Sequence, residues 1–577
     1  MSRRLRSEVP EGSPRWATRR AQWRALGLTD DDLVKPKIAI VNSSSGLAPC
    51  FAHLDPVAAA VKRSVEAAGG VGFEIRTVAP TDFIMSAGRG GGHVLSSRDL
   101  LAADIEAVVE GAQLDGMVCL ASCDKTTPGQ LMAAARTDVP TLVLACGYQS
   151  CGRLDNGERV DIEEVFLRAG GLKFGGITVD GLCDLSERAI TGPGVCTGMG
   201  TANSMHIVAE ALGMTLPGTA PVRANGETMW RAVEASGEAI VRAVREDRRP
   251  RTVMTPGAFA NAVMAVLAVS GSINCVKHLQ AVARESGAGI DVYRLFERYA
   301  DTIRPLAAVR PNGEDGIEEF EDAGGALAVL KQLGEALEGD AVTVTGDTMA
   351  DRVARAVVTD ERVIHPLSDP RGDHPTVVVV RGSLAPDTAI VKLSVTEERP
   401  ATFEGTARVF DDAPSAIAAI EGGGVRPGDV LVLRGLGPVG TPGMGMASQT
   451  VFALNGAGLT ERVAVVTDGQ LSGLVNKGIV VGEVQPEGVL PGPLGVVEDG
   501  DPISIDLAAR RVDLLVDERE LERRHAERPP HQVPGDSSGW LSVYARSVEP
   551  LHRGATLRGN DLPPSDRSTN AARAHRA

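Results

Sequence analysis

Aromatic side chains are scarce in this sequence, since Phe, Trp and Tyr together make up 3% of its 577 residues. Proteins that bind single-stranded nucleic acid stack bases on aromatic side chains, and phosphate backbones are held by clustered Lys and Arg. The net charge of −16 runs against the second requirement as well. We therefore expect a small-molecule ligand and no nucleic-acid partner.

Long hydrophobic runs are also missing. No stretch approaches the roughly 20 apolar residues of a membrane-spanning helix, and the first residues lead into Pro and Glu instead of an apolar signal segment. Glu8 and Glu11 interrupt an arginine-rich start that would otherwise suit an organelle presequence. We expect a cytoplasmic protein with no membrane association. Residues 561–577 lack periodicity, which predicts a disordered tail.

The eight cysteines include no C-x-x-C pair, which disfavours a zinc ribbon, and a disulfide framework is not expected in a reducing compartment. Cys119 and Cys275 lie in apolar or helical stretches and are interpreted as buried small hydrophobes. Cys50, Cys123 and Cys196 differ, because each lies in a segment rich in Gly, Pro or Asp that is typical of a loop.

Apolar runs alternate with helical patterns from residue 37 onward, which is typical of a parallel sheet covered on both faces. We predict strands at 38–41, 73–78, 117–120 and 141–144, with helices at 54–68 and 97–110 and from Pro128 onward. Further helices are expected at 202–212, 228–246, 258–269 and 275–285, where apolar residues recur every three or four positions.

The amino-acid composition changes at residues 366–372, which form a linker of Pro, Asp and Gly. Short Val-rich and Ile-rich strands follow, with short helices between them. We predict strands at 377–380, 389–393, 430–433 and 463–466, and a last helix at 517–527. The expected organisation is an extension (1–35), an α/β domain with added helices (36–368), a β-rich domain (376–560) and the tail.

Cys123, Asp124 and Lys125 set a thiol, a carboxylate and an amine side by side where an apolar run meets a helix start. Pro128, with Thr126 or Thr127 before it, suggests a first-turn proline and a hydroxyl cap. The triplet should therefore lie at the carboxyl end of a strand, the edge at which open α/β sheets bind ligands.

Several short motifs occur in a fixed order along the chain. They are PCFAHL (49–54), CDKTTP (123–128), GVCTGM (194–199) with TAN (201–203), GSIN (271–274), GP (437–438) with PGM (442–444), and TDG (467–469) with SG (472–473). Together they resemble the dihydroxyacid dehydratase and phosphogluconate dehydratase family, which includes aldonate dehydratases, over about residues 36–555. The resemblance implies an α/β/α parallel-sheet domain followed by a β-rich domain like a swivelling β-barrel.

The resemblance also implies cofactors. Cys50, Cys123 and Cys196 match the cysteines that hold an iron–sulfur cluster in the family, and three thiolates suit either a [2Fe–2S] or a [4Fe–4S] cluster. Asp82, Asp124 and Lys125 match positions that bind Mg²⁺, where the lysine can be carboxylated, since hard oxygen ligands suit that ion.

Ser472 matches the serine thought to act as the base in this family, with Lys125 as the second catalytic residue. Without the family, Asp-Gly followed by Ser-Gly would be interpreted as a turn. Because Ser472 lies in the second domain and the cysteines in the first, we expect the site between domains. Arg89, Ser272 and Asn274 are predicted to contact the substrate.

Some positions depart from the family pattern. Met446 stands where a magnesium-binding glutamate usually follows the Pro-Gly-Met motif, and Arg89 stands at a second acidic position. Phe51 replaces an asparagine, and residues 474–477 replace the usual Thr and Arg after the serine. Such changes alter the local charge by about three units, which matters beside a divalent ion.

The sequence thus predicts a hydro-lyase that converts a 2,3-dihydroxy carboxylic acid to a 2-keto acid, of the branched-chain amino-acid biosynthesis type. A sugar-acid dehydratase and a dehydratase of a specialised pathway are alternatives, and so is a diverged iron–sulfur protein that does not catalyse. The resemblance implies a homodimer or homotetramer.

Overall fold

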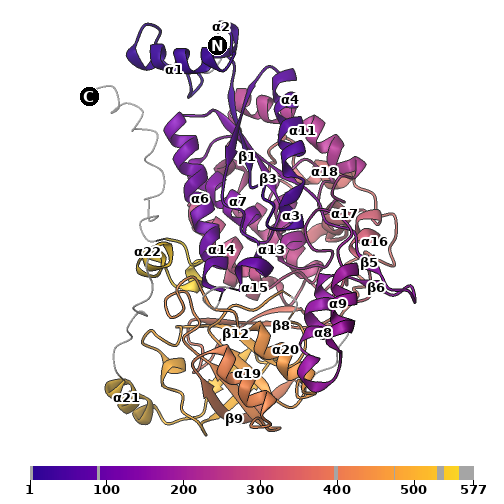
Figure 1. Ribbon diagram of the computed structural model, residues 1–577, viewed down its shortest axis with the longest axis vertical. Coiled ribbons are helices and arrows are strands. Elements are labelled where there is room, and N and C mark those ends of the chain that lie inside the picture. The colour runs from indigo at the N-terminus through magenta and orange to yellow at the C-terminus, as the bar shows by residue number, and fades with distance from the viewer. Residues whose placement is uncertain (1–3, 88–90, 396–400, 474, 529–538, 558–577) are drawn as a thin grey trace.

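The computed structural model describes residues 4–87, 91–395, 401–473, 475–528 and 539–557. The chain forms an N-terminal α/β domain, drawn in indigo to pink, and a C-terminal β-rich domain, drawn in orange and yellow (Figure 1). The predicted disordered tail lies outside the described residues. Among the residues that are described, none of the helices combines the length and the apolar character that crossing a membrane requires.

The first domain is built on a four-stranded parallel sheet in the order β2-β1-β3-β4. Its strands are β1 (Lys37–Asn42), β2 (Val71–Arg76), β3 (Gly116–Ala121) and β4 (Thr141–Ala145), and a small hairpin of β5 (Gly152–Arg153) and β6 (Arg159–Val160) follows. All residues of β1, β3 and β4 are buried, as continuous apolar runs in a sheet covered on both faces should be.

The α-helices before the second domain are α1 (Pro14–Ala25), α2 (Asp30–Leu33), α3 (Pro49–Ala52), α4 (Leu54–Ala67), α5 (Asp82–Met85), α6 (Gly92–Ala112), α7 (Thr126–Thr137), α8 (Ile162–Ala169), α9 (Val179–Arg188), α10 (Thr201–Ala211), α11 (Glu227–Glu246), α12 (Pro250–Val253), α13 (Pro256–Ala268), α14 (Asn274–Ser286), α15 (Val292–Tyr299), α16 (Ile317–Asp322), α17 (Gly325–Gln332) and α18 (Met349–Arg355). Helices α4 and α11 pack together on one face of the sheet. Helix α7 covers the other face, with α6, α10 and α14 packed against it.

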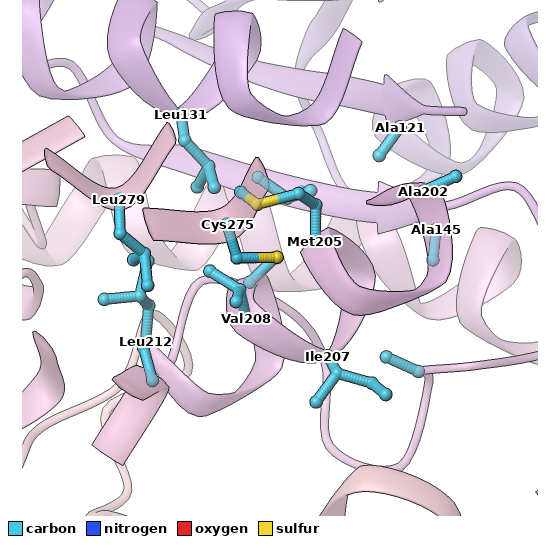
Figure 2. Packing of buried hydrophobic residues seen from close by; sticks show 14 of the residues in the cluster. Ala121, Leu131, Ala145, Ala202, Met205, Ile207, Val208, Leu212, Cys275 and Leu279 are labelled. Atoms are coloured by element: carbon cyan, nitrogen blue, oxygen red, sulfur yellow. The ribbon is translucent and has the colours of Figure 1, made fainter. Parts of the chain in front are cut away.

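Cys275 on α14 lies in this second layer, in the same cluster of buried side chains as Met205, Val208 and Leu279 (Figure 2). Its side chain has no exposed surface. Cys119 on β3 is buried in the same core. Both cysteines therefore have the buried, apolar surroundings that the sequence predicts.

Gly237 allows the close approach of α11 to α4. A Cβ atom at this position would lie 2.2 Å from the carbonyl carbon and oxygen of Ser64. In Gly237→Ala the helices must separate, so we expect a loss of about 2 kcal/mol in unfolding free energy even after the gain in helix propensity. Gly111→Ala, at an exposed position of α6 with open space around it, should be neutral or stabilising. Denaturant midpoints of both variants test this, and equal stability of the two would contradict it.

The C-terminal domain is an eight-stranded mixed sheet in the order β14-β13-β9-β10-β11-β12-β8-β7. Its strands are β7 (Val377–Val380), β8 (Thr388–Lys392), β9 (Thr402–Phe410), β10 (Asp429–Leu433), β11 (Ala464–Thr467), β12 (Val480–Gln485), β13 (Pro502–Asp506) and β14 (Arg511–Leu514), and its helices are α19 (Ala413–Glu421), α20 (Ser448–Gly456), α21 (Glu518–Glu527) and α22 (Trp540–Ser547). A parallel bridge between Arg381 and Arg511 joins the two edge strands, so the sheet nearly closes into a barrel. The predicted α/β fold with a barrel-like second domain is confirmed.

The alternating residues of these strands serve two cores. Val430 and Val432 face the barrel interior with Val378 and Val466. Leu431 and Leu433 face the other way and join the core that continues into the first domain. The two domains therefore share one hydrophobic interior along this face.

The segment after α22 returns to the first domain. Arg98 on α6 is fully buried, pairs with Asp99 at 3.0 Å, and donates from Nη2 to the carbonyl oxygens of Gly554 and Ala555, both at 2.9 Å. Tyr544 on α22 also donates to the Ala555 carbonyl, at 3.3 Å. The C-terminal segment is thus part of the interior of the N-terminal domain.

Several predicted elements have different boundaries in the structure. Helix α6 begins at Gly92, five residues before the predicted start, because Gly91 adopts a left-handed conformation that opens the helix. The hydroxyl cap predicted for the helix at Pro128 is wrong: Lys125 is the N-cap residue and no side chain caps the helix. Cys50, expected in a loop, lies in the short helix α3.

Candidate functional site

Cys123, Asp124 and Lys125 lie where β3 turns into α7, at the carboxyl edge of the parallel sheet. The turn is held by Thr126, whose hydroxyl donates to the Cys123 carbonyl at 2.7 Å and accepts from the Ser122 amide at 3.1 Å. The predicted position at a strand end is confirmed. The three side chains leave the backbone consecutively and so point in different directions from one turn.

The three cysteines come from separate segments that meet at this edge. Cys50 lies on α3 just after β1, Cys123 follows β3, and Cys196 lies in the loop before α10. The Cys123 and Cys50 thiols share a hydrogen bond, which together with burial raises the pKa of Cys123 well above its usual value. Burial, with Asp124, Glu163 and Cys50 nearby, raises the pKa of Cys196 in the same direction.

These thiols fit an iron–sulfur cluster by their chemistry. Thiolates are the ligands of such clusters, and buried thiols that repel each other's negative charge become thiolates when iron supplies the compensating charge. Within the part of the chain that the structure describes, no group of three or more His, Cys, Asp or Glu side chains is arranged to hold a metal ion. A cluster of several ions is larger than one ion, so its ligands do not have to converge on a single point.

Beside the cysteines, Lys125 is fully buried between two carboxylates. Its Nζ lies 2.8 Å from Asp82 Oδ2 and 3.9 Å from Asp124 Oδ2. Burial and the negative charge of Asp82 raise the pKa of Asp124 to about 7. Asp82 Oδ1 is buried and has no hydrogen-bond partner among the described residues. A spare carboxylate oxygen and a carboxylate with a raised pKa fit a site for a hard cation such as Mg²⁺.

Ser472 lies in the loop after β11, which is anchored by Asp468. This buried carboxylate accepts hydrogen bonds from the amides of Gly435, Leu436 and Gly488, at 2.9, 2.9 and 2.6 Å. The Ser472 amide donates to Ser448 Oγ at 2.6 Å, at the start of α20. The Asp-Gly turn inferred from sequence is thus a fixed loop rather than a free one.

A packing contact followed by hydrogen bonds connects this loop to Asp124. Gly473 lies against Ser272, since a Cβ on Gly473 would be 2.7 Å from Ser272 Oγ. Ser272 Oγ is 2.9 Å from Thr201 Oγ1, which accepts from Asn274 Nδ2 at 3.0 Å, and Thr201 in turn hydrogen-bonds Asp124. The structure therefore brings Ser272 and Asn274 to the same interdomain edge as Asp124. Arg89 lies outside the described residues.

Met446 lies where the family resemblance leads one to expect a glutamate. Its backbone bridges to Gln470, two residues before Ser472, and its Cγ approaches Gly91 so closely that a Cβ there would lie 2.6 Å away. The side chain therefore makes an apolar contact at the start of α6.

The sequence prediction missed a buried acidic residue, Glu163 on α8. Its carboxyl is 4% exposed, and burial with the charge of Asp161 raises its pKa well above the usual value. Asp124 adds to this shift, and Glu163 in turn raises the pKa of Cys196. The only sequence signal was an acidic residue at an inward position of an amphipathic helix.

The comparisons with known proteins cover almost the whole chain. Residues 35–352 match the family described as dihydroxy-acid/6-phosphogluconate dehydratase N-terminal, and residues 362–555 match its C-terminal counterpart. The chain belongs to this dehydratase family. The predicted family is thereby confirmed, with the fold that the family resemblance implies.

Relatives named dihydroxy-acid dehydratase are similar along their full length. The one from Ignicoccus hospitalis is 40% identical over 547 residues, which cover 94% of this chain and 98% of the relative. The one from Pyrococcus abyssi is 40% identical over 558 residues, covering 96% and 100%. The one from Methanococcoides burtonii is 38% identical over 555 residues, with the same coverage.

Proposed function

We propose that this family member is a hydro-lyase that dehydrates a 2,3-dihydroxy carboxylic acid to a 2-keto acid, as its relatives' name, dihydroxy-acid dehydratase, describes. The observation that supports this best is the meeting of two buried thiols, Cys50 and Cys123, and the half-buried Cys196 with Lys125, Asp82 and Asp124 at one sheet edge, against the loop that carries Ser472. Thiol ligands and oxygen ligands lie side by side there, as a reaction with two electrophiles requires.

Cys50, Cys123 and Cys196 would hold an iron–sulfur cluster, and Asp82, Asp124 and Lys125 would hold Mg²⁺, with Lys125 carboxylated. When bound, these groups supply Lewis acidity for the leaving hydroxyl and for the carboxylate end of the substrate. The donor set fits both, because the three thiols, two of them buried, meet at one sheet edge and Asp82 keeps a spare oxygen.

Ser472 Oγ would accept the proton from C2 of the substrate. The C3 hydroxyl would leave and take up a proton as water, and the enol that remains would tautomerise to the ketone. Ser272 and Asn274 would position the substrate from the first domain, because they join the Asp124 side of the site to the loop at Gly473. Arg89 is proposed as a further substrate contact from the sequence pattern alone.

We further propose that the protein works in the cytoplasm as a homodimer or homotetramer. The family resemblance supports both statements.

The experiment is to purify the protein without oxygen, record its visible absorbance and measure keto-acid formation from 2,3-dihydroxyisovalerate and from several aldonates. We expect cluster absorbance and turnover of at least one of these acids. An intact cluster with no keto acid from any of them would contradict the proposed function.

A further inference from the structure

A buried ion pair crosses from the first domain to the second at the edge of this site. Lys277 on α14 pairs with Glu483 on β12, and their side chains are 0% and 1% exposed. Lys277 Nζ donates to Glu483 Oε1 and to Asn274 Oδ1. Through Asn274 the pair joins the hydrogen bonds that reach Thr201, Ser272 and Asp124.

The backbone of Glu483 is strained. Its φ is 56°, a left-handed conformation that is unfavourable for a residue with a Cβ. The strain coincides with an irregularity between Gly482 and Gln485 in the pairing of β12 with β8. Gly482 packs directly against Leu471, the residue before Ser472, because a Cβ there would lie 2.3 Å from Leu471 Cδ1. The bulge thus turns a charged side chain inward beside the Ser472 loop.

One of the two oxygens of the Glu483 carboxylate has no hydrogen-bond partner among the described residues. Oε1 bonds Lys277, whereas Oε2 is buried and has no hydrogen-bond partner among the described residues. Burial raises the pKa of Glu483, and the ammonium groups of Lys277 and Lys125 act against that shift. A buried acceptor without a donor costs free energy, and such groups in native proteins usually have a purpose.

We infer that the Lys277–Glu483 pair is part of the substrate-binding surface, and that Glu483 Oε2 accepts a hydrogen bond from a substrate hydroxyl at C4 or beyond. This inference rests on the proposed function and names the substrate class of the same site: a polyhydroxylated acid rather than one with a branched alkyl chain.

The position of the hydroxyl follows from how the site is divided. In the proposed reaction, Lys125, Asp82, Asp124 and Ser472 act at the substrate's carboxylate, C2 and C3. A spare acceptor next to Asn274 is then available to a group further along the substrate. An alkyl chain placed there would leave Oε2 without a donor, and sites built to hydrogen-bond a hydroxyl reject analogues that lack it.

The test compares kcat/KM for D-xylonate and D-gluconate with kcat/KM for 2,3-dihydroxyisovalerate. We expect the protein to favour the better aldonate, and Lys277→Met/Glu483→Leu to lower this preference by about 10- to 100-fold, the value of one hydrogen bond to a charged group. Glu483→Gln, which keeps the shape of the side chain, should lower it in the same direction. Ligand-induced shifts in melting temperature give the same comparison for binding alone.

The matched control is Arg136→Met/Glu285→Leu. It removes a largely buried ion pair, 2.7 Å long, between Arg136 on α7 and Glu285 on α14, and this pair lies within the first domain. It should lower stability and leave the substrate preference unchanged. A preference unaltered in both Glu483 variants, or a native preference for the alkyl acid, would overturn the inference. If the native protein with intact cluster turns over no acid, the proposed function fails, and the melting-temperature shifts still decide whether Glu483 selects hydroxylated ligands.

Discussion

Ser472→Ala is expected to lower kcat by about 10²- to 10⁴-fold, the usual contribution of a positioned base, while cluster absorbance stays the same. The physical reason is that backbone contacts hold the loop. The backbone amide of Ser472 bonds Ser448, and Asp468 anchors the turn through three backbone amides. Alanine keeps these backbone contacts and removes the proposed proton acceptor. Steady-state assays on the best acid from the substrate panel measure the effect.

The control is Ser504→Ala on β13. This strand belongs to the same sheet, and β9 and β10 separate it from β11. It should keep full activity. A Ser472→Ala enzyme that retains turnover within threefold of the native protein would show that another group takes the C2 proton.

Cys123→Ser is expected to remove the visible absorbance and, with it, all measurable turnover. Cys123 is central among the three cysteines. Its thiol interacts with that of Cys50, and Asp124 and Lys125 follow it directly in the sequence. A serine hydroxyl is a far harder and more basic ligand than a thiolate, so an iron centre is held weakly by it. Anaerobic absorbance spectra and iron content check the result.

Cys183→Ser provides the comparison, since Cys183 is exposed on α9 and lies outside the proposed cluster site. Its iron content and turnover should equal those of the native protein. Full iron content in Cys123→Ser would mean that the cluster is held elsewhere. The proposal that Cys50 and Cys196 are cluster ligands would then be contradicted as well.

Local sequence patterns predicted most of the buried strands, because such strands are continuous apolar runs, but the fully buried β12 was not among them. Residues 377–380 were predicted with the bounds that β7 has, and the predicted cores of β1, β3 and β4 all lie within the observed strands. By contrast two strands were not predicted: β9, in which Ala407 is the one buried residue, and β13, whose buried residues alternate with more exposed ones. Alternation with many polar residues is a weaker signal than an unbroken apolar run.

The start of α7 shows why local signals fail at a functional site. Pro128 and the threonines before it favour a hydroxyl cap, but Thr126 is used to hold the turn at Cys123, and Lys125 begins the helix with its side chain between carboxylates. Contacts from Asp82, distant in sequence, override the cap preference.

The Lys277–Glu483 pair could not be predicted at all, because its members are 206 residues apart. Each alone resembles an ordinary charged residue on a helix or a strand. The motifs identified the residues of the proposed cluster and magnesium sites, whereas this pair is visible only when the two domains are packed together.

The contacts of Arg98 also bear on the order in which the chain folds during synthesis. Its guanidinium has no exposure, and two of its acceptors, the carbonyls of Gly554 and Ala555, lie 456 and 457 residues further along the chain. A buried charge that lacks its partners is strongly destabilising. The N-terminal domain leaves the ribosome first, but it therefore completes its interior only after the segment with Gly554 and Ala555 has been made. Until then, of the four residues that Arg98 contacts in these interactions, only Asp99 and His278 are present.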